Sequence, residues 1–423
     1  MSGLSVRGRD RFALTQAIGL VLVFIAAVVL VLWLGWVLPN QPMGDVPNVY
    51  RPWSAAVASG QVMGVTEKWV YPPLALLPML APYLLFGISD YIVAWGVFIA
   101  IISTIAFVLL VGDGRSRARR GAAMFWIAFV LACGPVGLYR IDAVTVPIAV
   151  VAVLWLARRP AVASALLTIG VWIKIWPAAM LLAALAVLRR KWALIVPAVG
   201  VSALVCLIVV MLGGAGNLFG FLGEQSDRGL QAEAPISTPY MWAAALRIPG
   251  AGVVYNADIV TFQVTGVGAD FFAWLMTPLL IVLSVVLAGL AFLRVRAGVD
   301  WRRMLPPLSF ALVLSFIVLN KVGSPQFQVW LVAPLVLWLL WERRAATRYA
   351  IGAVIAAALT QVVYPIMYDG IMVARPLAVL VLSARNIVLI ALLVGVIVHI
   401  VRLPVVGGVR APHRSSVDTQ ELK

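Results

Sequence analysis

The chain has 423 residues, of which 63% are hydrophobic and 11% are charged, with a net charge of +16 and a mean hydropathy of +1.05. A soluble protein carries roughly 25% charged residues, so this composition excludes an ordinary soluble domain. Apolar runs of about 20 residues, long enough to cross a bilayer as helices, recur along the sequence. We therefore expect an all-α polytopic membrane protein.

The excess positive charge lies in short clusters between the apolar runs, which argues against a nucleic-acid-binding protein. Basic loops of this kind mark the cytoplasmic side of a membrane protein. We expect residues 1–11 to be a cytoplasmic segment, residues 12–401 a single transmembrane domain, and residues 402–423 a basic, disordered cytoplasmic tail in a plasma-membrane protein. The clusters are Arg7–Arg11, Arg115–Arg120, Arg158–Arg159, Arg189–Lys191, Arg294–Arg303 and Arg343–Arg348.

The first part of the chain is predicted to cross outward and to return once. Phe12–Leu38 is the outward span, and residues 39–70 form an external loop. Tyr71–Ile88 is apolar but contains four prolines, which disfavour a straight helix. A full crossing there would place the next arginine cluster outside, so we expect a re-entrant element. Tyr91–Val111 is the returning span.

The middle of the chain contains a hairpin and an interrupted apolar run. Ala122–Tyr139 and Ile141–Ala157 are the two spans of the hairpin. Ala161–Leu188 lies between two basic clusters but is too short for two ordinary spans, and the sequence Lys-Ile-Trp-Pro starting at Lys174 interrupts it. We expect a broken pair of short helices there, followed by the outward span Trp192–Leu212.

The last part begins with the largest external loop, residues 213–270. Five further apolar runs follow it, and the complete chain is then predicted to hold about 12 membrane helices in one domain, some of them short or re-entrant. These runs are Phe271–Leu293, Met304–Leu319, Phe327–Trp341, Tyr349–Ile366 and Pro376–Val401.

Asp45, in the first external loop, is the best candidate for a catalytic base. The external loops contain several carboxylates but no histidine, so an enzyme working on that face would use a carboxylate as its proton acceptor. The two cysteines, Cys133 and Cys206, lie in apolar runs, and no His/Cys cluster exists in the sequence. No metal site or organic cofactor is therefore expected.

Four basic residues lie where a charged side chain is energetically unfavourable or where the chain turns tightly. Lys174 and Arg385 lie within apolar runs, and Arg140 and Lys321 lie at tight outer turns. A charge near the centre of a bilayer costs at least about 2.5–3.5 kcal/mol, so such residues usually have a function. Cations at the outer boundary would suit an anionic lipid headgroup such as a phosphate. The alternative is that they extend to the headgroups or pair locally, as Arg140 could with Asp142.

A polar segment, Ser226–Glu233, lies in the second external loop and is too polar to be a span. It could be a solvated loop or part of a site. The external aromatic residues could stack on sugar rings, although an interfacial aromatic belt would also explain them.

Several segments, taken in order, resemble the polyprenol-phosphate-sugar-dependent glycosyltransferases of family 87, in the GT-C superfamily, especially their actinobacterial members. The resemblance covers roughly residues 12–400. In this chain the interval from Asp45 to Tyr50 is one residue longer than is usual in that family. The matching pieces are Gly44-Asp45 with Tyr50, Trp69–Pro73, Lys174 with Trp176-Pro177, Asp227–Gln231 and Lys321–Gln326.

The resemblance implies a GT-C-type bundle with an extracytoplasmic active site. A sugar, most often mannose, would pass from a polyprenyl-phosphate donor to a glycolipid or polysaccharide acceptor by inverting displacement, with Asp45 as general base. Basic residues would bind the lipid phosphate, and other polar residues would contact the substrates. The first set is Lys174, Lys321, Arg228, Arg140 and Arg385, and the second is Tyr50, Tyr71, Gln231, Glu233, Ser324 and Gln326.

Other functions remain open at the level of sequence. Transfer of arabinofuranose is the alternative within the family. A lipid or solute transporter would explain the cations within apolar runs, because such charges line transport pathways. A scaffold of a cell-envelope assembly needs no buried cations, and is the weakest of these alternatives.

Overall fold

The computed structural model describes residues 3–226, 228–257 and 261–405. Within these residues the chain forms seventeen α-helices and one two-stranded sheet. Seven helices are long and apolar enough to cross a bilayer, and five apolar helical segments are shorter. The protein is therefore a multi-pass membrane protein, as its composition predicts.

Most of the predicted spans are helices whose ends differ from the prediction by a few residues, and Tyr91–Val111 has the predicted bounds. The helices are α1 Gly3–Val37, α2 Arg51–Ala56, α3 Leu76–Leu80, α4 Tyr91–Val111, α5 Arg117–Cys133, α6 Asp142–Trp155, α7 Pro160–Ile173, α8 Pro177–Val187, α9 Trp192–Met211, α10 Gly220–Ser226, α11 Thr238–Ala245, α12 Ala269–Arg296, α13 Trp301–Val318, α14 Val332–Trp341, α15 Arg343–Gln361, α16 Tyr368–Met372 and α17 Pro376–Arg402.

The break predicted within Ala161–Leu188 is present. Helix α7 begins with Pro160 at its first turn and ends at Lys174, whose backbone is extended. Helix α8 begins at Pro177, and proline is well tolerated in a first turn because its missing N–H would have no helical partner there. The chain therefore leaves one helix and enters the next around Lys174.

The proline-rich segment after the first external loop forms only short helical turns. The helical part runs from Pro73 to Leu84 and includes α3. Twelve residues would extend about 18 Å as an α-helix, well below the roughly 30 Å of a hydrocarbon core. As an α-helix this segment would therefore be too short to cross alone, and its re-entrant character stays a prediction.

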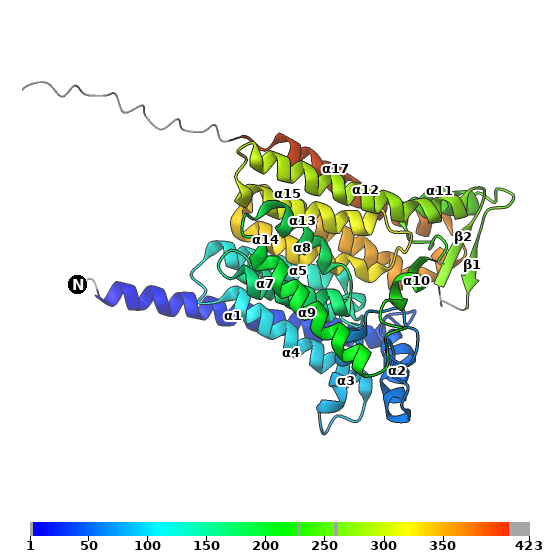
Figure 1. Ribbon diagram of the computed structural model, residues 1–423, viewed down its shortest axis with the longest axis horizontal. Helices are drawn as coiled ribbons and strands as arrows, with labels where there is room; N and C mark the ends of the chain where they lie inside the picture. Colours follow the sequence, from blue (N-terminus) through cyan, green and yellow to red (C-terminus); the bar gives the residue numbers. More distant parts are fainter. Residues whose placement is uncertain (1–2, 227, 258–260, 406–423) are drawn as a thin grey trace, which may run out of the picture.

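The predicted external loops lie together at one end of the molecule. Figure 1 shows α2, α10, α11 and the two strands at the end opposite the N-terminus. The described end of α17 lies at the same end of the molecule as the N-terminus. Strands β1 Gly252–Asn256 and β2 Thr261–Thr265 pair antiparallel, with Gly252 opposite Thr265. This hairpin is the one sheet among the described residues, and the mostly helical structure agrees with the predicted all-α class.

The centre of the bundle is formed by α13 and α14, whose apolar side chains are almost all buried. Three short helices, α6, α7 and α8, contribute further to this core. With 14, 14 and 11 residues, they extend about 21, 21 and 16 Å. None of them alone matches the roughly 30 Å of a hydrocarbon core.

Candidate functional site

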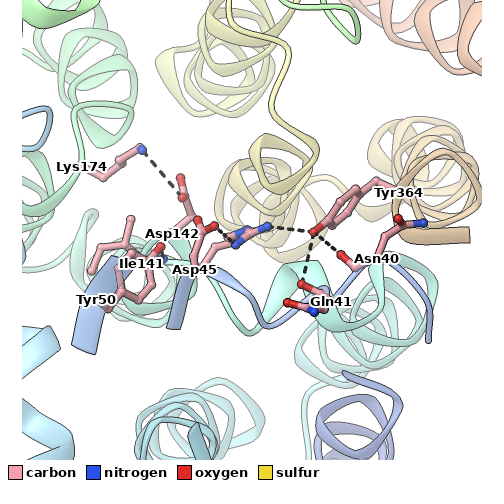
Figure 2. A network of polar contacts seen from close by, with 9 residues as sticks. Asn40, Gln41, Asp45, Tyr50, Ile141, Asp142, Lys174 and Tyr364 are labelled. Atoms are coloured by element: carbon pink, nitrogen blue, oxygen red, sulfur yellow. Dashed lines mark hydrogen bonds and ion pairs between the residues drawn. The ribbon is translucent and has the colours of Figure 1, made fainter. Parts of the chain in front are cut away.

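Asp45 lies between two tight backbone features, a pair of left-handed residues and a π-helical turn. Asn40 and Gln41 precede it with left-handed backbone conformations, φ 59° and 44°. A π-helical turn, Val46–Tyr50, follows it. The Asp45 side chain is 33% exposed, and its Oδ1 forms an ion pair with Arg140 (Figure 2). The chain therefore holds this carboxylate partly accessible, with one oxygen occupied.

Arg140 connects Asp45 to a distant part of the chain. It lies in the turn between α5 and α6, and its side chain is nearly buried. Its Nη2 donates to the hydroxyl of Tyr364 over 3.2 Å, and that hydroxyl donates to the carbonyl of Asn40 over 3.2 Å (Figure 2). Arg140 thus pairs with Asp45, and the alternative pairing with Asp142 is not adopted.

A second pair of charges lies beside the first (Figure 2). The Nζ of Lys174 is 3.9 Å from Oδ2 of Asp142, which is too far for a hydrogen bond. The Asp142 side chain has no exposed surface, and its Oδ1 accepts a 2.6 Å hydrogen bond from the indole of Trp330. Asp142 is therefore fixed, whereas Lys174 is held by charge alone.

Two predicted substrate-binding tyrosines line the same region. The Nζ of Lys174 lies 4.4 Å from the ring centroid of Tyr71, a cation–π contact. The hydroxyl of Tyr50 accepts a 2.9 Å hydrogen bond from the backbone N–H of Ile141. Burial raises the pKa of Tyr50 well above its ordinary value, so this phenol stays neutral. Tyr50 therefore joins the loop of Asp45 to the turn of Arg140.

The polar segment of the second loop is folded into the protein, so the solvated-loop alternative is wrong for its described end. Gln231 and Glu233 are buried. The N–H of Gln231 donates to the carbonyl of Lys321 over 3.0 Å. A side chain at Gly323 would collide with the backbone of Glu233 and Ala234, so only glycine permits this approach. The two predicted motifs therefore pack directly on each other.

Arg385 reaches the same segment from α17. It is buried, and its Nη2 donates to the carbonyl oxygen of Glu233 over 2.5 Å. Burial raises the pKa of the Glu233 carboxyl to about 7, although Arg385 and Arg140 both act in the opposite direction. Arg140 therefore influences Glu233 as well as Asp45, and the two groups of residues share one electrostatic environment.

The other predicted site residues lie on the same two segments, the one that contains Gln231 and the one that contains Gly323. Arg228 is half-buried at the start of the segment that contains Gln231. Ser324 and Gln326 are half-buried in the turn that follows Gly323. Asp227, which the family pattern includes, lies outside the described residues, as do residues 406–423 of the predicted tail.

Three residues of this network were not predicted as site residues. Asp142, Trp330 and Tyr364 all bond to predicted residues or to one another. Asp142 carried a signal in the sequence, because it is a carboxylate at the start of an apolar run. Trp330 and Tyr364 carried none, since aromatic residues are common in membrane helices.

This arrangement places a partly exposed carboxylate next to two cations, of which one is already bonded to protein groups and the other can still bind an anion. The first cation, Arg140, is already committed to Asp45 and Tyr364. The second, Lys174, has an ammonium group that makes no hydrogen bond to the described part of the chain. A base and an anion-binding group are therefore available together. Comparison with protein-family models, curated proteins and solved structures gives no match.

Within the described ranges, no group of three or more His, Cys, Asp or Glu residues is positioned to hold a metal ion.

Proposed function

We propose that this protein is a membrane-embedded glycosyltransferase that transfers a sugar, mannose in the simplest case, from a polyprenyl phosphate to a hydroxyl of a glycolipid or polysaccharide. The observation that carries the proposal is the convergence of Asp45, Arg140 and Lys174 at one end of the bundle. The basic clusters of the predicted cytoplasmic loops support a cytoplasmic location for both termini, and with it an extracytoplasmic location for the site.

The proposed reaction is a direct displacement. Asp45 takes the proton of the acceptor hydroxyl while its oxygen attacks the anomeric carbon. The bond between that carbon and the phosphate oxygen breaks, and the electron pair leaves with the phosphate. Lys174 stabilises the charge that develops there, with Lys321 and Arg228 as further candidates. Arg140 holds the Asp45 carboxylate in place.

Two hollows at the start of α4 suit a lipid-linked substrate, and neither is lined by Asp45, Arg140 or Lys174. One has a volume of about 270 Å³ and includes Pro47, two residues after Asp45, together with Arg51 and Asp90. The other, of about 410 Å³, lies under the mostly apolar segment from Pro82 to Ser89. Ser89 and Tyr91 line both, so a polar and an apolar hollow adjoin each other. A chain with a polar head has the matching character.

The test is transfer of radiolabelled mannose from polyprenyl phosphomannose to membrane lipid by the purified protein. We expect Asp45→Asn to lower turnover by at least about 1,000-fold, since the substituted amide cannot accept the proton. Asp369→Asn, an equivalent change at an exposed residue of α16, is the matched control. Near wild-type transfer by a folded Asp45→Asn variant would refute the role of Asp45.

Two other activities are separated by the same preparation. Polyprenyl phosphoarabinose as donor tests for arabinofuranosyl transfer. The helix is interrupted at Lys174. Interrupted helices also form the binding sites of many transporters. Counterflow of sugar or lipid in liposomes, without any transfer product, would favour transport over catalysis.

A further inference from the structure

The charges of the site balance in the absence of substrate. Asp45 and Arg140 form one pair, and Asp142 and Lys174 form the other. The formal charges of these four groups therefore sum to zero. A site dedicated only to holding an anion would not need a fixed negative charge beside its cation, so Asp142 requires an explanation.

Asp142 is placed as the buried ion-pair partner of Lys174 and not as a second base. It is fully buried, so an acceptor hydroxyl has no access to it. Its Oδ1 is fixed by Trp330, and the Trp330 ring stacks on Trp176, which donates to Thr145 over 2.8 Å. The carboxylate is therefore anchored within an aromatic frame, with its Oδ2 3.9 Å from Nζ of Lys174.

The proposed reaction changes the charge of the lipid phosphate. The donor is a phosphodiester with one negative charge. Once the bond to the sugar breaks, the product is a phosphomonoester, whose second ionisation has a pKa near 6, so it carries close to two negative charges at pH 7.5. The proton that balances this change is the one that Asp45 has taken from the acceptor. Cations alone would therefore hold the product more tightly than the donor.

We propose that Asp142 is a specificity-determining residue that keeps this site from retaining the phosphomonoester product. Its fixed negative charge repels the second charge of the product while leaving Lys174 able to bind the singly charged donor. The inference rests on the proposed function, because it concerns the donor and the product of that reaction. It applies to product release, a step that often limits turnover in enzymes.

The direct test compares two short-chain probes, citronellyl phosphate and citronellyl phosphomannose, by equilibrium binding to the full chain in detergent at pH 7.5. We expect Asp142→Asn to bind citronellyl phosphate about tenfold more tightly, equivalent to about 1.4 kcal/mol. Binding of citronellyl phosphomannose should tighten by no more than about threefold. Asp369→Asn should change neither. An equal change for both probes, or no change, would overturn the proposal.

A kinetic measurement adds a readout that a structural role would not produce. In Asp142→Asn the first turnover should proceed at least as fast as in the wild type, because part of the second charge already develops in the transition state, and the steady-state rate should be about tenfold lower because the product is retained. Equal loss in both phases would overturn the proposal. The side chain of asparagine has nearly the same shape and can still accept the hydrogen bond of Trp330.

The wild-type protein tests the idea even if Asp142→Asn does not fold. It should bind citronellyl phosphomannose at least as tightly as citronellyl phosphate. A wild type that binds the monoester tenfold more tightly would overturn the inference alone, since binding of both probes would still agree with a transferase. Binding of neither probe would refute the inference and the proposed function together.

Discussion

Helices α9 and α13 differ in what surrounds them. Only 17% of the most apolar stretch of α9 is buried in the protein, against 78% for α13. Yet α9 has no charged residue, whereas α13 begins with two arginines and contains two prolines. In a bilayer the lipid is as apolar as a leucine side chain. The more apolar helix, α9, therefore lies at the lipid-facing periphery. Burial of a helix in this protein depends on its packing and polar contacts, and not on how apolar it is.

The same contrast applies to length. Peripheral α9 and α12 have 20 and 28 residues, while α6, α7 and α8, which end near the charged network, have at most 14. The side chains of Arg140, Asp142 and Lys174 at the ends of these helices are largely buried in the protein, where the effective dielectric constant is lower and electrostatic interactions are stronger. Substitutions in the network should therefore have large effects, and substitutions on the peripheral faces small ones.

The largest effect on stability is expected for Lys174→Gln. It leaves the buried carboxylate of Asp142 without its cation, which typically destabilises a protein by about 3–5 kcal/mol. The double variant Asp142→Asn with Lys174→Gln should recover most of this loss but not donor affinity. Thermal unfolding in detergent and the donor KM measure the two effects. Equal melting temperatures for the single and double variants would show that the pair contributes nothing.

A smaller effect, and one that depends on pH, is expected at Glu233. Burial raises its pKa to about 7, while in the unfolded chain it titrates near 4.3. The folded state therefore binds a proton more tightly, and stability falls as pH rises from about 4.5 to 7, by roughly 3 kcal/mol. Glu233→Gln should flatten this part of the profile of melting temperature against pH. If the slope of melting temperature against pH were unchanged in Glu233→Gln, another group would be responsible for the pH dependence.

Gly323→Ala should destabilise the protein by about 1–3 kcal/mol, because the new methyl group would overlap the backbone of Glu233 and Ala234. Gly200→Ala is the matched control. A methyl group there meets nothing within 4 Å, and alanine is the better helix former. The melting temperatures of the two variants should move in opposite directions. A neutral Gly323→Ala would mean that the contact between the two loops is adjustable.

Much of the helical architecture could be predicted from the sequence, because the bilayer imposes length and composition on each span. The break at Lys174 was predictable since charge and proline interrupt an apolar run there. The β-hairpin was not, because its strands are only five residues long and lie in a loop with no strong alternation of polar and apolar residues.

The sequence could predict which residues form the site, but not which of them form ion pairs with each other. Asp45, Lys174 and Arg140 are charged residues in apolar or confined surroundings, and such positions are visible in a sequence. Which acid pairs with which cation depends on the packing of segments far apart in the chain. Arg140 is two residues from Asp142 but pairs with Asp45, because the turn between α5 and α6 directs it toward Tyr364.

The smallest effect should come from the lipid-facing surface, and it tests the comparison most directly. Ile281 on α12 is 59% exposed, so in the membrane its side chain contacts lipid. Ile281→Ala exchanges protein–lipid contacts for lipid–lipid contacts of similar strength and should alter the free energy of unfolding by less than about 0.5 kcal/mol. Leu312→Ala, on fully buried α13, leaves a cavity and should destabilise by about 2–5 kcal/mol. If the two variants melted at the same temperature, the distinction between a packed centre and a lipid-solvated periphery would be wrong.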